Sequence, residues 1–209
     1  MKRARILLAD DHLLTLEGIR TVLEPHHEIV GTAADGRALL EAALRLKPEL
    51  IVLDITMPLL NGVDAAVQIK KSLPETKLLF VTMHVNPAYL EAALDAGGTG
   101  YVLKSAARRE LLEAVDSVLK GRIYITPSLS GEDLDRFRDP TQAAAALRLS
   151  TREREVLQLI AEGHAAKEIA HVLNISTRTV SFHRENIKRK LGLRSTSELT
   201  KHAIEQRLI

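Results

Sequence analysis

The first 120 residues alternate between short apolar runs and longer amphipathic segments. The apolar runs have the length of strands, and they cover Ile6–Ala9, Ile29–Ala34, Leu50–Leu53, Leu78–Val81 and Tyr101–Leu103. The segments between them have helical spacing, near residues 13–24, 36–47, 63–72, 87–96 and 107–120. Five strand–helix units predict an α/β domain of the flavodoxin-like (βα)5 type, with a buried parallel sheet that carries helices on both faces.

The last 60 residues show only helical periodicity, which predicts a small all-α domain. Ser150 or Thr151, with Glu153 behind it, fits a capping box that opens a helix through about Ala161. Further helices are expected at about 166–173, from 177 to near 191, and from about Thr196 onward. The tight turn 174–176 between the second and third helices is the plan of a helix-turn-helix.

Residues 121–149 follow neither pattern. Gly and Pro at positions 121, 127, 131 and 140 interrupt the periodicity, and Thr141–Leu149 is Ala-rich. We therefore expect three parts: a first domain over 1–121, a linker with a helix over 122–147, and the helical domain over 148–209.

Charge differs between the two predicted domains. Residues 1–120 carry a net charge of −2, and residues 150–209 carry +4. A chance fluctuation would give the same asymmetry, but it is also typical of domains that bind different partners.

Composition excludes several classes of protein. The chain has no Cys, which rules out disulfides, thiolate metal sites and a cysteine nucleophile. No apolar stretch approaches the ~18 residues of a membrane span, and the run Ile6–Ala9 is too short for the core of a signal peptide. We expect a cytoplasmic protein that does not contact a membrane.

Polar side chains follow four of the five predicted strands. They are Asp10 and Asp11, Asp54, Thr82, and Lys104. In open α/β sheets the functional site lies at the carboxyl ends of the strands, and strands 1 and 3 are neighbours in the flavodoxin-like order. Three carboxylates brought together repel one another unless a cation or a proton intervenes, and oxygen ligands suit Mg²⁺.

The chemistry that fits this group is attack by an Asp54 oxygen on a phosphoryl group. Lys104 would hold a phosphoryl oxygen as a point charge, and Thr82 offers a hydroxyl donor. Acids at strand ends are individually common as solvated loop residues. It is the combination at several strand ends that points to a site. His12, His26 and His27 lack metal-ligand spacing and are expected at the surface.

On these residues, positions 4–120 resemble a response-regulator receiver domain. Asn61-Gly62 also matches the pattern. The resemblance implies that Asp54 accepts phosphate from a sensor histidine kinase. It implies Mg²⁺ bound by Asp11, Asp54 and the main-chain carbonyl of Thr56, with Asp10 helping. It also implies a switch in which Thr82 moves to the phosphoryl group and Tyr101 turns inward.

The predicted helix 177–191 has one apolar side and one polar side. Val180, Ile187 and Leu191 fall within about 20° of one another on a helical wheel and form the buried stripe. The opposite side can read base edges and neutralise phosphates, although an ordinary solvated helix face has the same composition. The candidate DNA-binding residues are Thr177, Arg178, Thr179, Ser181, Phe182, Glu185, Lys188, Arg189 and Lys190.

Residues 150–209 are similar to the LuxR/GerE-type helix-turn-helix domain, also called the NarL/FixJ type. The resemblance is carried by Thr151–Val156, Leu159–Gly163, Lys167–Ala170, Ile175-Ser176, Thr179-Val180, His183 and Lys190–Leu193. It implies double-stranded DNA as a partner, bound through the helix 177–191, and a homodimer formed through the last helix. At positions 181, 182 and 185, where many relatives carry a basic or amide group, this chain has Ser, Phe and Glu.

The leading hypothesis is a transcription regulator controlled by phosphorylation, not a turnover enzyme. An Asp-dependent phosphohydrolase would use the same carboxylates, but Thr56 stands where it would place a second Asp. A nucleotide-binding oxidoreductase lacks its Gly-rich fingerprint after the first strand. A DNA-binding regulator that ignores phosphorylation leaves the Asp–Thr–Lys set unexplained.

Overall fold

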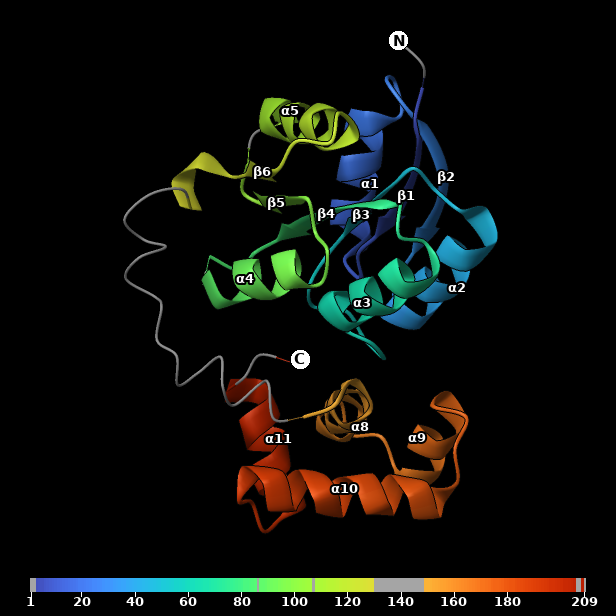
Figure 1. The fold of residues 1–209 in the computed structure, drawn as a ribbon, viewed down its shortest axis with the longest axis vertical. Coiled ribbons are helices and arrows are strands. Elements are labelled where there is room, and N and C mark those ends of the chain that lie inside the picture. The colour runs from blue at the N-terminus through green and yellow to red at the C-terminus, as the bar shows by residue number, and fades with distance from the viewer. Residues whose placement is uncertain (1–2, 86, 107, 130–148, 206–207, 209) are drawn as a thin grey trace. The chain divides into compact units, whose positions relative to one another are not determined.

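A parallel sheet of six strands forms the centre of the first unit of this computed structural model (Figure 1). The structure describes residues 3–85, 87–106, 108–129, 149–205 and 208. The chain divides into two units, which are described separately. The predicted linker helix in the Ala-rich segment 141–148 lies outside the described residues.

The strand order is β2-β1-β3-β4-β5-β6, which confirms the flavodoxin-like prediction for the first five strands. Their bounds are β1 Arg5–Ala9, β2 Glu28–Ala33, β3 Leu50–Leu53, β4 Lys77–Thr82, β5 Gly100–Leu103 and β6 Tyr124–Ile125. The central strands are buried on both faces, as parallel strands between helix layers must be.

The sixth strand corrects the sequence analysis, which placed a linker from residue 122. Tyr124–Ile125 pairs with Gly100-Tyr101 of β5, and the short 3₁₀ helix Pro127–Leu129 follows. A strand of two residues is too short to show a hydrophobic periodicity in the sequence. It becomes visible only in the folded chain, where it pairs with the open edge of β5.

Helices cover both faces of the sheet (Figure 1). Helices α1 (Leu13–Leu23) and α5 (Arg108–Leu119) contact each other on one face. The chain of contacts α2–α3–α4 covers the other face, with α2 at Gly36–Leu46, α3 at Gly62–Ser72 and α4 at Pro87–Asp95. Every predicted strand and helix of this unit is present within one or two residues of its expected ends.

The second unit contains four helices in its described part: α8 (Thr151–Ala161), α9 (Ala166–Val172), α10 (Thr177–Leu191) and α11 (Thr196–Glu205). Val156, Leu159, Ile187 and Leu199 are among the buried residues of its core. The capping box is confirmed, because Ser150 Oγ accepts from the Glu153 amide while the Glu153 carboxylate accepts from the Ser150 amide. Asn174 makes the predicted turn with a left-handed φ of 52°.

Within the described residues, no helix combines the length and the apolar character that a membrane crossing requires.

Candidate functional site

The carboxyl ends of four strands bring the predicted site residues together. Ala9 of β1 pairs with Leu53 of β3, so Asp10 and Asp54, the next residues, emerge side by side. Thr82 ends β4 opposite Leu103 of β5, and the amide of Lys104 donates to the Thr82 carbonyl at 2.8 Å. The parallel register therefore places both acids and the lysine at one edge of the sheet, as the strand pattern predicted.

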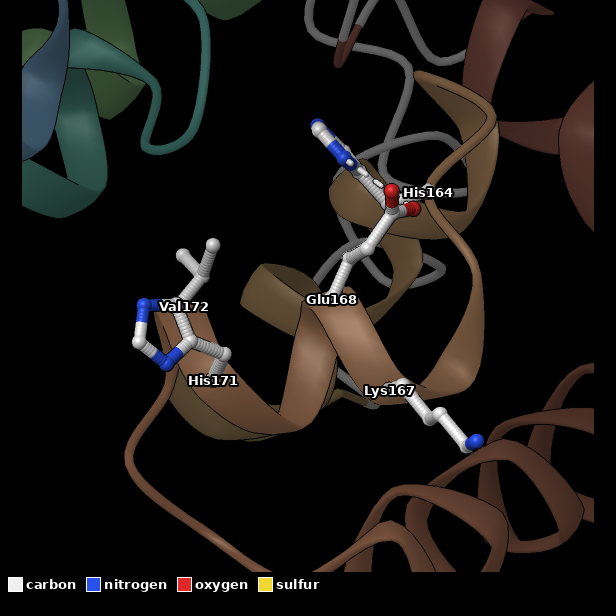
Figure 2. Close-up of a pocket in the computed structure, with 5 residues that line it drawn as sticks. All are labelled: His164, Lys167, Glu168, His171 and Val172. Atoms are coloured by element: carbon white, nitrogen blue, oxygen red, sulfur yellow. Dashed lines mark ion pairs between the residues drawn. The ribbon is translucent and has the colours of Figure 1, made fainter.

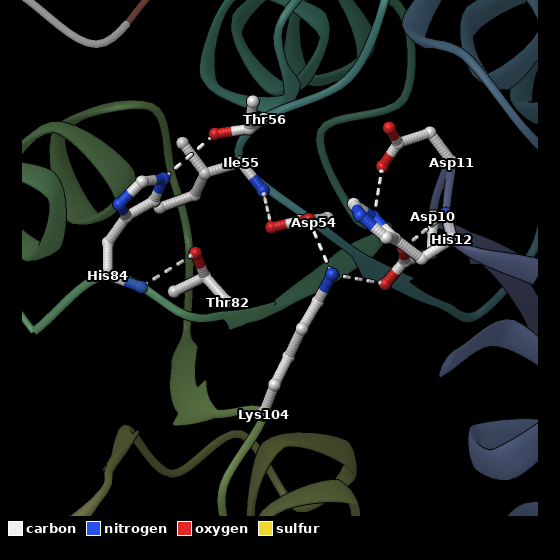
Figure 3. A network of polar contacts seen from close by, with 9 residues as sticks. All are labelled: Asp10, Asp11, His12, Asp54, Ile55, Thr56, Thr82, His84 and Lys104. Carbon is white, nitrogen blue, oxygen red and sulfur yellow. Dashed lines mark hydrogen bonds and ion pairs between the residues drawn. The ribbon is translucent and has the colours of Figure 1, made fainter. Parts of the chain in front are cut away.

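Lys104 joins two buried carboxylates (Figure 3). Its Nζ lies 2.7 Å from Asp10 Oδ2 and 2.6 Å from Asp54 Oδ2. Asp10 is 1% exposed and Asp54 5%. The other oxygen of Asp54, Oδ1, accepts from the Ile55 amide at 2.6 Å. Both oxygens of Asp54 are thus held in place, one by a cation and one by the backbone.

The charges at this site are perturbed by burial and by one another. Burial raises the pKa of the Asp54 carboxyl and the Asp10 charge adds to it, whereas the hydrogen bond and charge of Lys104 oppose the increase. Burial alone would lower the pKa of Lys104, but its hydrogen bonds and charge interactions with Asp10 and Asp54 raise it above the ordinary value. The lysine therefore stays a cation at neutral pH.

A group of possible metal ligands lies at the same point. One ligand atom each from Asp10, Asp11, His12 and Asp54 lies within 4.8 Å of the others. The three carboxylates supply the oxygen donors that Mg²⁺ prefers. They also exceed the single positive charge of Lys104, so a divalent cation fits the charge balance of this cluster.

His12 was missed as a member of this cluster. Its side chain is exposed, as the sequence predicted, but Nδ1 lies 2.8 Å from Asp11 Oδ1 and its amide donates to Asp10 Oδ1 at 2.8 Å. The signal available in the sequence was its position directly after two acids at a strand end.

Thr82 and Tyr101 meet at His84. The His84 amide donates to Thr82 Oγ1 at 3.3 Å, and the Tyr101 hydroxyl donates to the His84 carbonyl at 2.9 Å. Tyr101 is fully buried, and burial raises the pKa of its phenol, which keeps the hydroxyl protonated. The Tyr101 side chain therefore points into the protein interior in this structure.

Thr56 faces the same region from the loop after β3. Its hydroxyl lies 2.8 Å from His84 Nε2 (Figure 3). The His84 ring stacks on Tyr89 of α4, with the ring centroids 4.3 Å apart. The contacts among Thr56, His84 and Tyr89 connect the loop after β3, which carries Thr56, with the loop after β4, which carries His84. The role expected of Thr56 concerns its main-chain carbonyl, which these side-chain contacts do not test.

Gly62 shapes the loop that carries Asp54. A Cβ atom there would lie 1.9 Å from the Asp54 carbonyl oxygen. Its amide donates to the Ile55 carbonyl at 2.7 Å, and Asn61 caps α3 by accepting from the Asp64 amide. Asn61-Gly62 therefore holds the loop closed against the backbone of the site.

The helix α10 carries the predicted DNA-binding residues. Val180 and Ile187 are buried in the core as predicted, and Leu191 is half-buried. Ser176 Oγ accepts from the Thr179 amide at 3.0 Å and fixes the start of the helix. The nine candidate residues are exposed or half-buried, with Thr177, Arg178, Phe182, Glu185, Arg189 and Lys190 the exposed ones.

Several polar candidates on α10 already have partners within the unit. Ser181 donates to the Thr177 carbonyl, and Lys188 Nζ lies 3.2 Å from Glu185 Oε1. Lys190 donates to the buried Glu153 of α8 at 2.6 Å. A structural ion pair thus competes with any contact of Lys190 to DNA.

A surface hollow next to α9 is lined by His164, Lys167, Glu168, His171 and Val172 (Figure 2). His164 lies near two carboxylates, with Nε2 3.4 Å from Glu162 and Nδ1 3.9 Å from Glu168. His171 points away from this pair in the figure. The side chains of Lys167, Glu168 and His171 therefore point in different directions around the hollow (Figure 2).

Comparisons with known proteins match both units. Residues 6–116 match the response regulator receiver domain, and residues 147–203 match the luxR family of bacterial regulatory proteins. The transcriptional regulatory protein MctR of Rhizobium johnstonii is 34% identical over 213 residues, which cover 99% of this chain and 96% of MctR.

Solved structures of similar proteins include DNA complexes. RcsB from Salmonella enterica serovar Typhimurium, bound to promoter P1flhDC in the presence of the phosphomimetic BeF₃⁻, is 33% identical with a TM-score of 0.63, over 96% of this chain and 98% of that one. A structure of two RcsB dimers bound to two parallel DNAs is 31% identical with a TM-score of 0.58, over 98% and 99% of the two chains.

Proposed function

We propose a phosphorylation mechanism from one premise: the chain belongs to the two-component response regulators that join a receiver domain to a LuxR-type DNA-binding domain. It is a DNA-binding transcription regulator and not a turnover enzyme. Our proposal is that Asp54 is the phosphoacceptor and that its phosphorylation controls dimeric binding to DNA.

The observation that supports this proposal is the position of the Asp54 carboxylate between Lys104 and the acidic pair. An Asp54 oxygen would form the new P–O bond while the P–N bond to a phosphohistidine of the kinase breaks, with the electron pair left on the imidazole nitrogen. Lys104 would then turn from Asp54 Oδ2 to a phosphoryl oxygen. Asp10, Asp11 and Asp54, with the main-chain carbonyl of Thr56, would hold Mg²⁺, which supplies charge neutralisation for the transferring group.

The switch in our proposal uses Thr82 and Tyr101. A phosphoryl group on Asp54 would accept a hydrogen bond from the Thr82 hydroxyl, which draws the end of β4 toward the site. The Tyr101 hydroxyl donates a hydrogen bond to the carbonyl of His84, two residues beyond Thr82. This movement would therefore favour the orientation in which the Tyr101 side chain points inward. Phosphorylation shifts the equilibrium only by as much as it stabilises that arrangement over the alternatives.

The partners follow from the family. A receiver domain implies a sensor histidine kinase as a partner. We propose that the kinase transfers its phosphoryl group to this protein in the cytoplasm. The similar RcsB binds DNA as dimers, and we propose that this chain does the same, through α10 in the major groove and through α11 between protomers.

Incubation with Mg²⁺ and acetyl phosphate tests the phosphoacceptor. Intact-protein mass spectrometry should show one added phosphoryl group on the wild type and none on Asp54→Asn. Asp116→Asn, an exposed acid of the same domain, is the matched control and should be labelled like the wild type. Equal labelling of Asp54→Asn would overturn the assignment.

A further inference from the structure

An aromatic side chain stands on the polar side of α10. Phe182 is 63% exposed, and the exposed side chains before and after it on this side are Arg178, Glu185 and Arg189. A single exposed apolar side chain is ordinary on a protein surface. Phe182 is distinctive because it lies in the first half of the helix, the part of a helix-turn-helix that reaches base edges.

An acid lies one turn further along the same side. Glu185 is exposed, and its Oε1 lies 3.2 Å from Lys188 Nζ and 3.7 Å from Arg184 Nε. Both cations approach this one oxygen, and within the described part of the chain Oε2 has no hydrogen-bond or ion-pair partner. A carboxylate on a surface that meets phosphates is repelled unless a donor on the DNA compensates it.

We infer that Phe182 and Glu185 are the residues with which this protein reads sequence, and that they select a thymine and a cytosine on neighbouring base pairs of each half-site. The inference rests on the proposed DNA binding through α10. Phe182 has no hydrogen-bonding group, and the thymine methyl is the apolar feature of the major groove. Glu185 only accepts hydrogen bonds, and the cytosine amino group is a donor that carboxylates accept from there.

The spacing of the two residues agrees with adjacent base pairs. Residues three apart lie on one side of a helix, about 4.5 Å apart along its axis. Successive base pairs rise by about 3.4 Å. Ser181, which lies between Arg178 and Glu185 on α10, already donates to the Thr177 carbonyl, whereas Phe182 and Glu185 are both exposed.

Thymine-to-uracil exchange tests Phe182, because it removes only the methyl group. A duplex is first selected from random DNA with the full-length phosphorylated protein, and Kd is measured by fluorescence anisotropy for each thymine replaced in turn. We expect one thymine per half-site whose exchange weakens wild-type binding about fourfold, the effect of one buried carbon group. Phe182→Ala should bind both duplexes equally, and Phe182→Leu should retain the preference.

Exchange of the neighbouring C·G pair for T·A tests Glu185, because it replaces an amino donor by a carbonyl acceptor. The wild type should prefer the C·G duplex about fivefold to tenfold, and Glu185→Gln should lose that preference. The readout is the ratio of two Kd values, in which the general gain in affinity from removing a negative charge cancels.

The outcomes separate this inference from the proposed function. If no duplex is selected or bound, DNA binding through α10 itself fails. If a specific duplex is bound but wild type and Phe182→Ala respond alike to uracil, or wild type and Glu185→Gln give the same ratio, the assignment of the reading residues is overturned while DNA binding stands.

Discussion

One ammonium group bridges two buried carboxylates in the receiver domain. Lys104 Nζ lies within 2.7 Å of both Asp10 and Asp54, and the side chains of all three are largely removed from solvent. Such a cluster costs desolvation energy that its hydrogen bonds only partly offset, so it is weak evidence for stability and better evidence for function.

Replacement of Lys104 by Met should show how much Lys104 contributes to phosphorylation of Asp54 and how much it contributes to the stability of the fold. We expect phosphorylation of Asp54 to slow on the order of 10²-fold, because a preorganised charge at the transferring group is lost. The free energy of unfolding should fall by about 3 kcal/mol, because two buried carboxylates lose their shared cation. Labelling rates with acetyl phosphate and urea denaturation measure the two effects.

Lys120→Met is the control, since Lys120 pairs with Asp116 at the surface and should change either quantity little. Phosphorylation of Lys104→Met at the wild-type rate would show that Lys104 does not act on the phosphoryl group.

Gly62 gives a second residue-scale prediction. In Gly62→Ala the new methyl group would meet the Asp54 carbonyl at 1.9 Å, so the loop must move. We expect a loss of about 1–3 kcal/mol in the free energy of unfolding, together with slower labelling of Asp54. Gly18→Ala in α1 meets nothing within 4 Å and should instead gain about 0.5–1 kcal/mol. Wild-type labelling and stability in Gly62→Ala would contradict the close approach.

At the scale of elements, polar contacts join α8 to α9 and α10 in the DNA-binding domain. Glu153 is 4% exposed, caps α8 through Ser150 and accepts from Lys190 of α10. The Arg152 guanidinium donates hydrogen bonds to the Glu155 carboxylate and to the carbonyl of Leu173 at the end of α9. These contacts hold α9 and α10 against α8.

The Glu153 contact predicts a pH dependence. Burial raises the pKa of Glu153, but the hydrogen bonds from Lys190 and Ser150 outweigh it and lower the pKa below the ordinary 4.5. A carboxyl whose folded pKa is depressed stabilises the fold above its unfolded pKa, and this contribution is lost as the pH falls through the folded value. The wild-type unfolding free energy should therefore drop below pH 4.5, as followed by circular dichroism in urea.

Glu153→Gln should remove this pH-dependent part and lower the unfolding free energy at pH 7 by about 1–3 kcal/mol, through the lost charge pair and the weakened cap. Glu205→Gln, an exposed acid in α11, should leave the curve unchanged. An unaltered pH profile in Glu153→Gln would refute the pair as its source.

At the scale of the whole molecule, regulation requires a coupling free energy between the phosphorylation site and the DNA-binding helix. Couplings of this kind are about 1–3 kcal/mol, which corresponds to about 5–150-fold in affinity. We expect phosphorylation to tighten DNA binding by a factor in this range in the wild type and to leave Asp54→Asn unaffected, as measured by anisotropy at one fixed salt concentration.

Reciprocity makes this coupling testable from the other side. Because coupling free energies are symmetric, operator DNA should tighten the binding of beryllium fluoride to the receiver by the factor by which beryllium fluoride tightens the binding of operator DNA. Isothermal titration with and without DNA measures it. Equal beryllium fluoride affinity in both titrations, alongside phosphorylation-dependent DNA binding, would contradict a two-state equilibrium shared by the two domains.

The sequence by itself determined five strands of the sheet, the described helices of both units and the edge of the sheet where the polar side chains gather. Burial on both faces makes the strands of a parallel sheet apolar throughout, so Asp10, Asp54, Thr82 and Lys104 stood out where those runs end. The capping box of α8 and the buried stripe of α10 were equally readable, because both depend on residues within a few positions of one another.

Tertiary structure alone decided the contacts between residues far apart in the chain. The reach of Lys104 to two acids, the pairing of Glu153 with Lys190 and the fit of Gly62 against Asp54 depend on how distant segments pack. The two-residue β6 forms because β5 offers it an edge, and Tyr101 is held inward by a carbonyl 17 residues before it. Local periodicity records the environment of each position but not the identity of its neighbour, which only the folded chain supplies.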